Sequence, residues 1–194
     1  MQDFALYFEL GWQHILDWQG YDHILFVLVL CCSYTLTDWR KILLLVTAFT
    51  IGHSLTLALS VLNFVRVNSA WIEFMIPLTI LVTTSLNIIG RKTKKTGSWL
   101  KYTLTLFFGL IHGMGFSNYL KSLLGKSTNI ATELFAFNIG LEFGQLMIVL
   151  ISLATSFFLI NLIKITQKDW IFFLSSAIFG ISFIMSAERL AALL

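Results

Sequence analysis

Apolar residues in this chain come in long blocks, and short polar links separate the blocks. A helix of about 20 apolar residues is long enough to cross roughly 30 Å of hydrocarbon. The blocks therefore predict about six membrane-spanning helices, at residues 21–36, 39–62, 70–89, 100–120, 130–163 and 170–193. We expect an all-α fold, a polytopic bundle of transmembrane helices that forms a single integral membrane domain over residues 1–194.

The segment before the first block has a mixed pattern. Between residues 3 and 18, aromatic and aliphatic residues are interrupted by Asp3, Glu9, His14 and Asp17. This pattern is too polar for a span, and its aromatic residues suit the membrane interface. We therefore predict an N-terminal interfacial or re-entrant helix. The segment lacks a basic start and a small-residue cleavage site, so we expect no cleaved signal peptide.

The composition supports a membrane protein. The chain is 57% hydrophobic and 12% charged, whereas a soluble domain is about 25% charged. The net charge of +3 does not indicate nucleic-acid binding, because the basic residues lie in the links between blocks. Cys31 and Cys32 are adjacent within an apolar run, so we expect no structural disulfide between them. We expect the lipid bilayer as a partner and no nucleic acid, and the oligomeric state stays open.

The distribution of basic residues predicts the orientation, because cytoplasmic loops carry an excess of Lys and Arg. Nine basic residues follow the first, third and fifth spans, namely Arg40, Lys41, Arg91, Lys92, Lys94, Lys95, Lys101, Lys164 and Lys168. Four lie on the other side, namely Arg66, Lys121, Lys126 and Arg189. This excess predicts a multi-pass protein of the cell (inner) membrane with both termini outside.

Ionisable residues of several predicted spans fall at a similar depth. A helix rises about 1.5 Å per residue, so His53 lies roughly 21 Å along the second span and His112 roughly 18 Å along the fourth. Asp22 and His23 begin the first span at its outer edge, and Glu142 lies within the fifth. Such residues are costly in hydrocarbon and usually functional. Imidazole with carboxylate and amide oxygens binds nickel, cobalt, zinc or iron(II); the same groups can also relay protons or activate water.

Other polar residues are placed to orient these groups by hydrogen bonds. Asn138, Glu142 and Gln145 share one helical face at positions i, i+4 and i+7. The residues that we expect to support the metal ligands are Thr50, Ser54, Glu73, Asn138 and Gln145.

Four segments carry a distinctive combination of residues: HILDWQGYDHILF (14–26), VTAFTIGHSLTLAL (46–59), FGLIHGMGF (108–116) and FNIGLEFGQL (137–146). Together they resemble the HupE/UreJ membrane proteins, over roughly residues 11–150. The resemblance implies a polytopic protein linked to nickel or cobalt uptake, with an early His and Asp-His pattern that binds the metal. Here His14 lies eight residues before Asp22, a longer spacing than in the family pattern, and the second permease signature is represented only by His112-Gly113.

These observations favour a secondary permease for a divalent transition metal, with nickel or cobalt first and zinc or iron(II) behind them. The expected metal ligands are His14, Asp17, Asp22, His23, His53, His112 and Glu142. Of these, His14 and Asp17 would capture the ion outside, and the others would bind it within the bundle.

Two other functions remain open from the sequence. A membrane-embedded metal-dependent hydrolase would hold zinc with His23, His53 and His112, and Glu142 or Asp22 would activate a zinc-bound water. A structural metal, or an accessory role with a partner, is the third alternative. Between enzyme and transporter, we expect a transporter.

Overall fold

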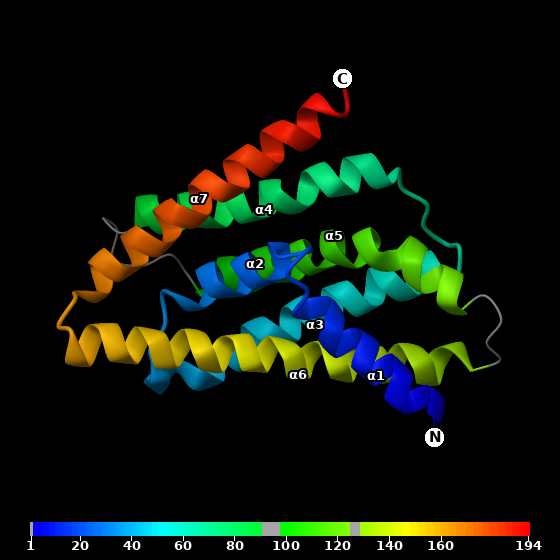
Figure 1. The fold of residues 1–194 in the computed structure, drawn as a ribbon, viewed down its shortest axis with the longest axis horizontal. Helices are drawn as coiled ribbons and strands as arrows, with labels where there is room; N and C mark the ends of the chain where they lie inside the picture. Colours follow the sequence, from blue (N-terminus) through cyan, green and yellow to red (C-terminus); the bar gives the residue numbers. More distant parts are fainter. Residues whose placement is uncertain (1, 91–97, 125–128) are drawn as a thin grey trace.

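The computed structural model describes residues 2–90, 98–124 and 129–194, and this part of the chain is helical without a strand (Figure 1). The helices are α1 (Gln2–Ile15), α2 (Asp22–Cys31), α3 (Trp39–Val61), α4 (Ser69–Gly90), α5 (Ser98–Leu124), α6 (Ile130–Phe157) and α7 (Gln167–Ala191). A short 3-10 helix, Leu36–Asp38, precedes α3, and a π-helical turn, Phe158–Leu162, extends α6. The all-helical fold class is confirmed. The basic residues Arg91, Lys92, Lys94, Lys95 and Lys126, on which the predicted orientation partly rests, lie outside the described residues.

Four helical segments of the described chain are long and apolar enough to cross a membrane: Leu36–Val61, Ser69–Gly90, Ile130–Leu162 and Gln167–Ala191. The predicted number of about six spans is therefore not confirmed. Helix α5 has 27 residues, but it includes Lys101, His112 and three glycines, which make it less apolar. Helix α2 has only ten residues, which cover roughly 15 Å, about half of the hydrocarbon thickness.

Helices α1 and α2 together follow the length of the bundle as one interrupted helix (Figure 1). Helix α1 starts at the end of the bundle where both chain termini lie, which we call the terminal end, and stops near the middle. Helix α2 starts near the middle and runs toward the opposite end, and Asn87 of α4 donates to the carbonyl of Val29 near its last turn at 2.9 Å. The predicted first span, 21–36, therefore corresponds to the second half of this interrupted helix.

Glycine contacts bring α1 close to α6. A Cβ atom at Gly11 would lie 2.0 Å from the carbonyl oxygen of Phe137, and one at Gly140 would lie 2.0 Å from that of Phe8. Small residues allow the backbones of membrane helices to approach in this way. The N-terminal segment was predicted to be an interfacial or a re-entrant helix. The close packing of α1 against α6 agrees with a helix that enters the bundle and not with one that lies apart at the membrane interface.

Helices α3 and α5 form a second close pair, and they run in the same direction. A Cβ atom at Gly109 would lie 2.3 Å from the carbonyl oxygen of Phe49, and one at Gly113 would lie 2.2 Å from that of His53. The third pair, α4 and α7, runs antiparallel, and its terminal end carries an ion pair between Glu73 and Arg189 at 2.6 Å. The three pairs surround α2, whose first turn faces the middle of α3 and α5.

The α1–α6 packing generates a stability prediction. In Gly140→Ala the added methyl group meets the backbone of α1, so we expect unfolding to become easier by about 1–3 kcal/mol, as for other overpacked sites. Thermal unfolding of the purified protein in detergent, followed by circular dichroism, measures the change.

Gly180→Ala is the matched control, because a Cβ atom at Gly180 would have no neighbour within 4 Å. We expect its melting temperature to stay equal to that of the wild type or to rise slightly, since alanine favours the helix. Equal melting temperatures for the two variants would contradict the described α1–α6 contact.

Candidate metal centre

Three histidines from three helices converge at the interruption between α1 and α2. They are His14 in the last turn of α1, His23 in the first turn of α2 and His53 in the middle of α3. One ring nitrogen from each lies within 4.8 Å of those of the other two. His23 and His53 are buried and His14 is half-buried. This spacing is suited to three imidazoles that share one ion.

The ring nitrogens of these histidines are mostly unpaired. Nε2 of His14, Nε2 of His23 and both ring nitrogens of His53 have no hydrogen-bond partner within the described residues, whereas Nδ1 of His23 lies 3.1 Å from a carboxylate oxygen of Asp22. A buried polar group without a partner costs about 1–3 kcal/mol, so native proteins rarely leave several together. The unpaired nitrogens are therefore available to a polar ligand, and neutral imidazole nitrogens are the commonest metal ligands in proteins.

His112 of α5 lies on the other side of His23. Its ring centroid is 5.1 Å from that of His23, and the residue is almost fully buried. Its Nδ1 lies 2.8 Å from the carbonyl oxygen of Phe108, so Nδ1 carries the proton and donates. The lone pair is then on Nε2, which has no partner within the described residues. His112 is placed as a fourth imidazole beside the group of three.

Asp22 is the carboxylate at this site. Its Oδ1 accepts the backbone N–H of His23 at 2.9 Å and lies 3.1 Å from Nδ1 of the same residue. A carboxylate beside one ring nitrogen fixes the ring of a metal-binding histidine and directs the other nitrogen to the ion. The position of Asp22 thus favours Nε2 of His23 as the ligand atom.

Aromatic rings enclose the histidines, and these rings were not among the site residues predicted from the sequence. The ring of Phe116 lies 3.9 Å from that of His14 between centroids, Phe137 stacks on His53 at 6.4 Å, and Phe49 stacks on the same ring at 6.0 Å. The signal was present, because each phenylalanine belongs to one of the four segments quoted above. These rings limit the access of water and lower the local dielectric constant.

The position of Asp22 and His23 along the bundle differs from the expected one. They were expected at the outer edge of the first span, but His23 lies beside His53 and His112 near the middle of the bundle. The reason is that α1 occupies the half of the bundle between these residues and the terminal end (Figure 1). The same arrangement places His14 in the cluster itself and not above it.

Glu142 does not reach the cluster, contrary to expectation. Its Oε1 accepts a hydrogen bond from Thr47 at 3.0 Å, and Oε1 of Gln145 accepts one from Thr50 at 2.8 Å. The residue of α6 that faces His53 is Phe137, and Glu142 lies five residues further along, roughly 7.5 Å. Both hydrogen bonds join α6 to α3. They lie between the histidine cluster and the end of the bundle opposite to the chain termini.

The other expected residues form no hydrogen bond with the histidines within the described chain. Asp17 is exposed in the link between α1 and α2, where its Oδ1 accepts the backbone N–H of Gln19. Glu73 pairs with Arg189 at the terminal end. Ser54 donates to the carbonyl of Thr50 in its own helix at 2.6 Å, and Asn138 is half-buried, with no partner for Oδ1 within the described residues.

Three or four imidazoles with one nearby carboxylate form a donor set of intermediate softness. Such sets suit nickel, cobalt, zinc and iron(II) better than calcium or magnesium, which prefer oxygen ligands. No cysteine lies beside this cluster in the described chain, because Cys31 and Cys32 are at the far end of α2. The site fits a divalent transition metal.

Comparison with known proteins agrees with the sequence motifs. The family described as HupE / UreJ protein matches residues 1–188, nearly the whole chain. No curated protein and no solved structure matches. On the strength of this match, the chain belongs to the HupE/UreJ family.

Proposed function

We propose that this protein is a permease that binds a divalent transition metal ion, nickel or cobalt first and zinc behind them, and carries it across the cell membrane. The observation that carries the proposal is the convergence of His14, His23 and His53, with unpaired ring nitrogens, at the interruption between α1 and α2. His112 is the fourth candidate ligand, and Asp22 orients His23. Membership in the HupE/UreJ family supports a role in metal transport.

The interrupted helix supports transport over storage. Discontinuous helices are typical of transporters, in which they place binding groups near the middle of the membrane and allow access from each side in turn. Here α1 leads from the terminal end to the histidines, and α2 leads from them to the opposite end. A tilt of α1 against α6 would open one side, and a shift of α2 would open the other. Because metal and protons compete for imidazole nitrogens, release can be coupled to proton uptake.

The hydrolase alternative receives less support from the geometry. It requires a base beside a metal-bound water, but Glu142 lies away from the histidines and is bonded to Thr47. Asp22 lies against Nδ1 of His23, a position suited to orienting a ligand. We therefore retain transport as the proposed function.

Removal of two imidazoles tests the metal site. In the double variant His23→Ala/His53→Ala we expect the affinity for Ni²⁺ or Co²⁺ to fall at least about 100-fold, since two of the three clustered imidazole ligands are lost. Isothermal titration of the purified protein measures binding, and uptake of radioactive nickel into proteoliposomes measures transport.

Gln13→Ala is the control, because Gln13 is exposed next to His14 and its side chain donates to Glu9 and to no other residue of the described chain. It should bind and transport like the wild type. If the wild type binds no divalent metal more tightly than the double variant, the metal site is refuted. Binding without uptake would leave the site in place and refute transport.

A second substitution tests the orienting role of Asp22. Asp22→Asn keeps the size of the side chain but removes its charge, so we expect metal affinity to fall about 10–100-fold, as for other residues that orient metal ligands. Asp17→Asn should leave affinity unchanged, because Asp17 is exposed in the link. Equal affinities of the two variants would contradict the role given to Asp22.

The proposed orientation has its own test. Both termini lie at the same end of the bundle (Figure 1), and the basic residues favour the outside for that end. A C-terminal alkaline phosphatase fusion should be active in a bacterial host, and a green fluorescent protein fusion at the same residue should be dark. The reverse pattern would place the termini in the cytoplasm.

A further inference from the structure

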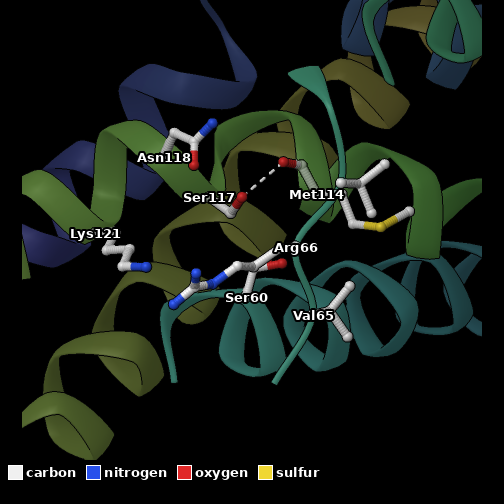
Figure 2. A pocket seen from close by; sticks show the side chains of 8 residues that line it. Ser60, Val65, Arg66, Met114, Ser117, Asn118 and Lys121 are labelled. Atoms are coloured by element: carbon white, nitrogen blue, oxygen red, sulfur yellow. Dashed lines mark hydrogen bonds between the residues drawn. The ribbon is translucent and has the colours of Figure 1, made fainter. Parts of the chain in front are cut away.

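A polar cavity lies at the terminal end of the α3–α5 pair, outside the histidine cluster (Figure 2). Its volume is about 430 Å³, within the usual range for small-molecule sites. The last turns of α3 and α5 and the link between α3 and α4 supply its walls. The lining residues are Ser60, Val65, Arg66, Val67, Met114, Ser117, Asn118 and Lys121.

The cavity stands on the same two helices as the metal centre. Ser60 follows His53 by seven residues on α3, and Ser117 follows His112 by five residues on α5. These separations correspond to roughly 10 Å and 7.5 Å along the helix axes. The cavity is therefore one to two helical turns nearer to the terminal end than the histidines.

The lining carries two positive charges, Arg66 and Lys121, and none of the described lining residues is acidic. Lys121 donates to Oδ1 of Asn63, a neutral group, and forms no ion pair with the described part of the chain. Arg66 forms no hydrogen bond or ion pair with the described part of the chain. By contrast, Arg189 at the same end is paired with Glu73. The charge of this cavity is thus a local property and not a general feature of the terminal end.

Two like charges exclude a bare metal cation from this cavity, so it is not a second metal site. They favour an anion instead, because a guanidinium group offers paired N–H donors that match the oxygens of a carboxylate or phosphate. Lys121 has two further N–H donors, and the buried hydroxyl of Ser60 lies on the cavity wall. Figure 2 shows the side chains of Arg66 and Lys121 on the same side of the cavity.

We propose that this cavity binds an oxyanion, a carboxylate or a phosphate group, with Arg66 as its principal contact and Lys121 as the second. Two sources offer this chemistry: a free small carboxylate or phosphate ligand, and the phosphate of a lipid headgroup. The proposal holds whether or not the histidine cluster transports a metal, because it rests on different residues.

The test uses the full chain, purified in a maltoside detergent that contains no phosphate, and two probes, citrate and inorganic phosphate. Isothermal titration should give saturable binding of at least one probe, at least about tenfold weaker in Arg66→Gln and abolished in Arg66→Gln/Lys121→Gln. Arg66→Lys should bind with intermediate affinity, because it keeps the charge and loses the paired donors. Melting temperatures establish that each variant is folded.

Two controls separate this site from others. Arg189→Gln removes a basic residue at the same end that does not line the cavity, so it should bind the probes like the wild type. His53→Ala should also bind them normally, and it would lose the metal if the proposed function holds. If the wild type binds the oxyanion probes but no metal, the proposed metal site fails and the oxyanion site stands. If it binds metal but no oxyanion, the reverse holds.

A lipid arm distinguishes the two sources. If no free probe binds, native mass spectrometry of the wild type and Arg66→Gln, each purified from the same membrane, should show an anionic phospholipid that the wild type retains and the variant loses. Free-probe binding identifies a soluble ligand, and selective lipid retention identifies a headgroup. If neither occurs, or if Arg66→Gln and Arg189→Gln behave alike, the oxyanion site is overturned.

Discussion

Close backbone contact at glycine residues is the constraint on which the rest of this structure depends. Without a hydrophobic driving force between them, membrane helices associate through packing, and small residues allow the closest approach. Gly11 and Gly140 set α1 against α6, and Gly109 and Gly113 set α5 against α3. The first contact brings the end of α1 to the middle of the bundle, and the second brings His112 near His53. The histidine cluster is thus brought together by residues that carry no chemistry of their own.

The interruption between α1 and α2 has a cost that the histidines help to explain. Ending a helix inside a bundle leaves backbone groups without helical partners, and such breaks are tolerated only where protein or a polar cavity surrounds them. Here the first turn of α2 points toward imidazole rings, and Asp22 accepts the backbone N–H of His23 in that turn. The same carboxylate thus accepts one backbone N–H of the new helix start and lies against a proposed ligand. Structure and proposed chemistry depend on one residue at this point.

The sequence predicted the helical fold well, because apolar blocks of spanning length have few alternative structures. The observed α3, α4 and α7, and α6 together with its π-helical turn, begin and end within a few residues of the expected spans. It also grouped His23, His53 and His112 correctly as neighbours. The interruption was missed, because residues 3–18 are amphipathic enough to suggest an interfacial helix. Whether such a segment lies on the bundle or enters it depends on glycine contacts with α6, which no local pattern reveals.

Glu142 shows the limit of depth arguments. Its depth can be estimated from sequence, but its direction depends on which face of α6 meets α3, and Phe137 occupies the place opposite His53. The observed position of Glu142, outside the histidine cluster, still bears on the proposed mechanism. A divalent ion bound by neutral imidazoles beside Asp22 would retain about one uncompensated positive charge. Glu142 is the next carboxylate toward the opposite end, held by Thr47. A carboxylate that lies one to two helical turns from such an ion, toward the opposite end, would attract the ion in that direction. A structural metal, by contrast, is better held by ligands that balance its charge. This separation of imidazoles from carboxylate favours passage of the ion over permanent residence.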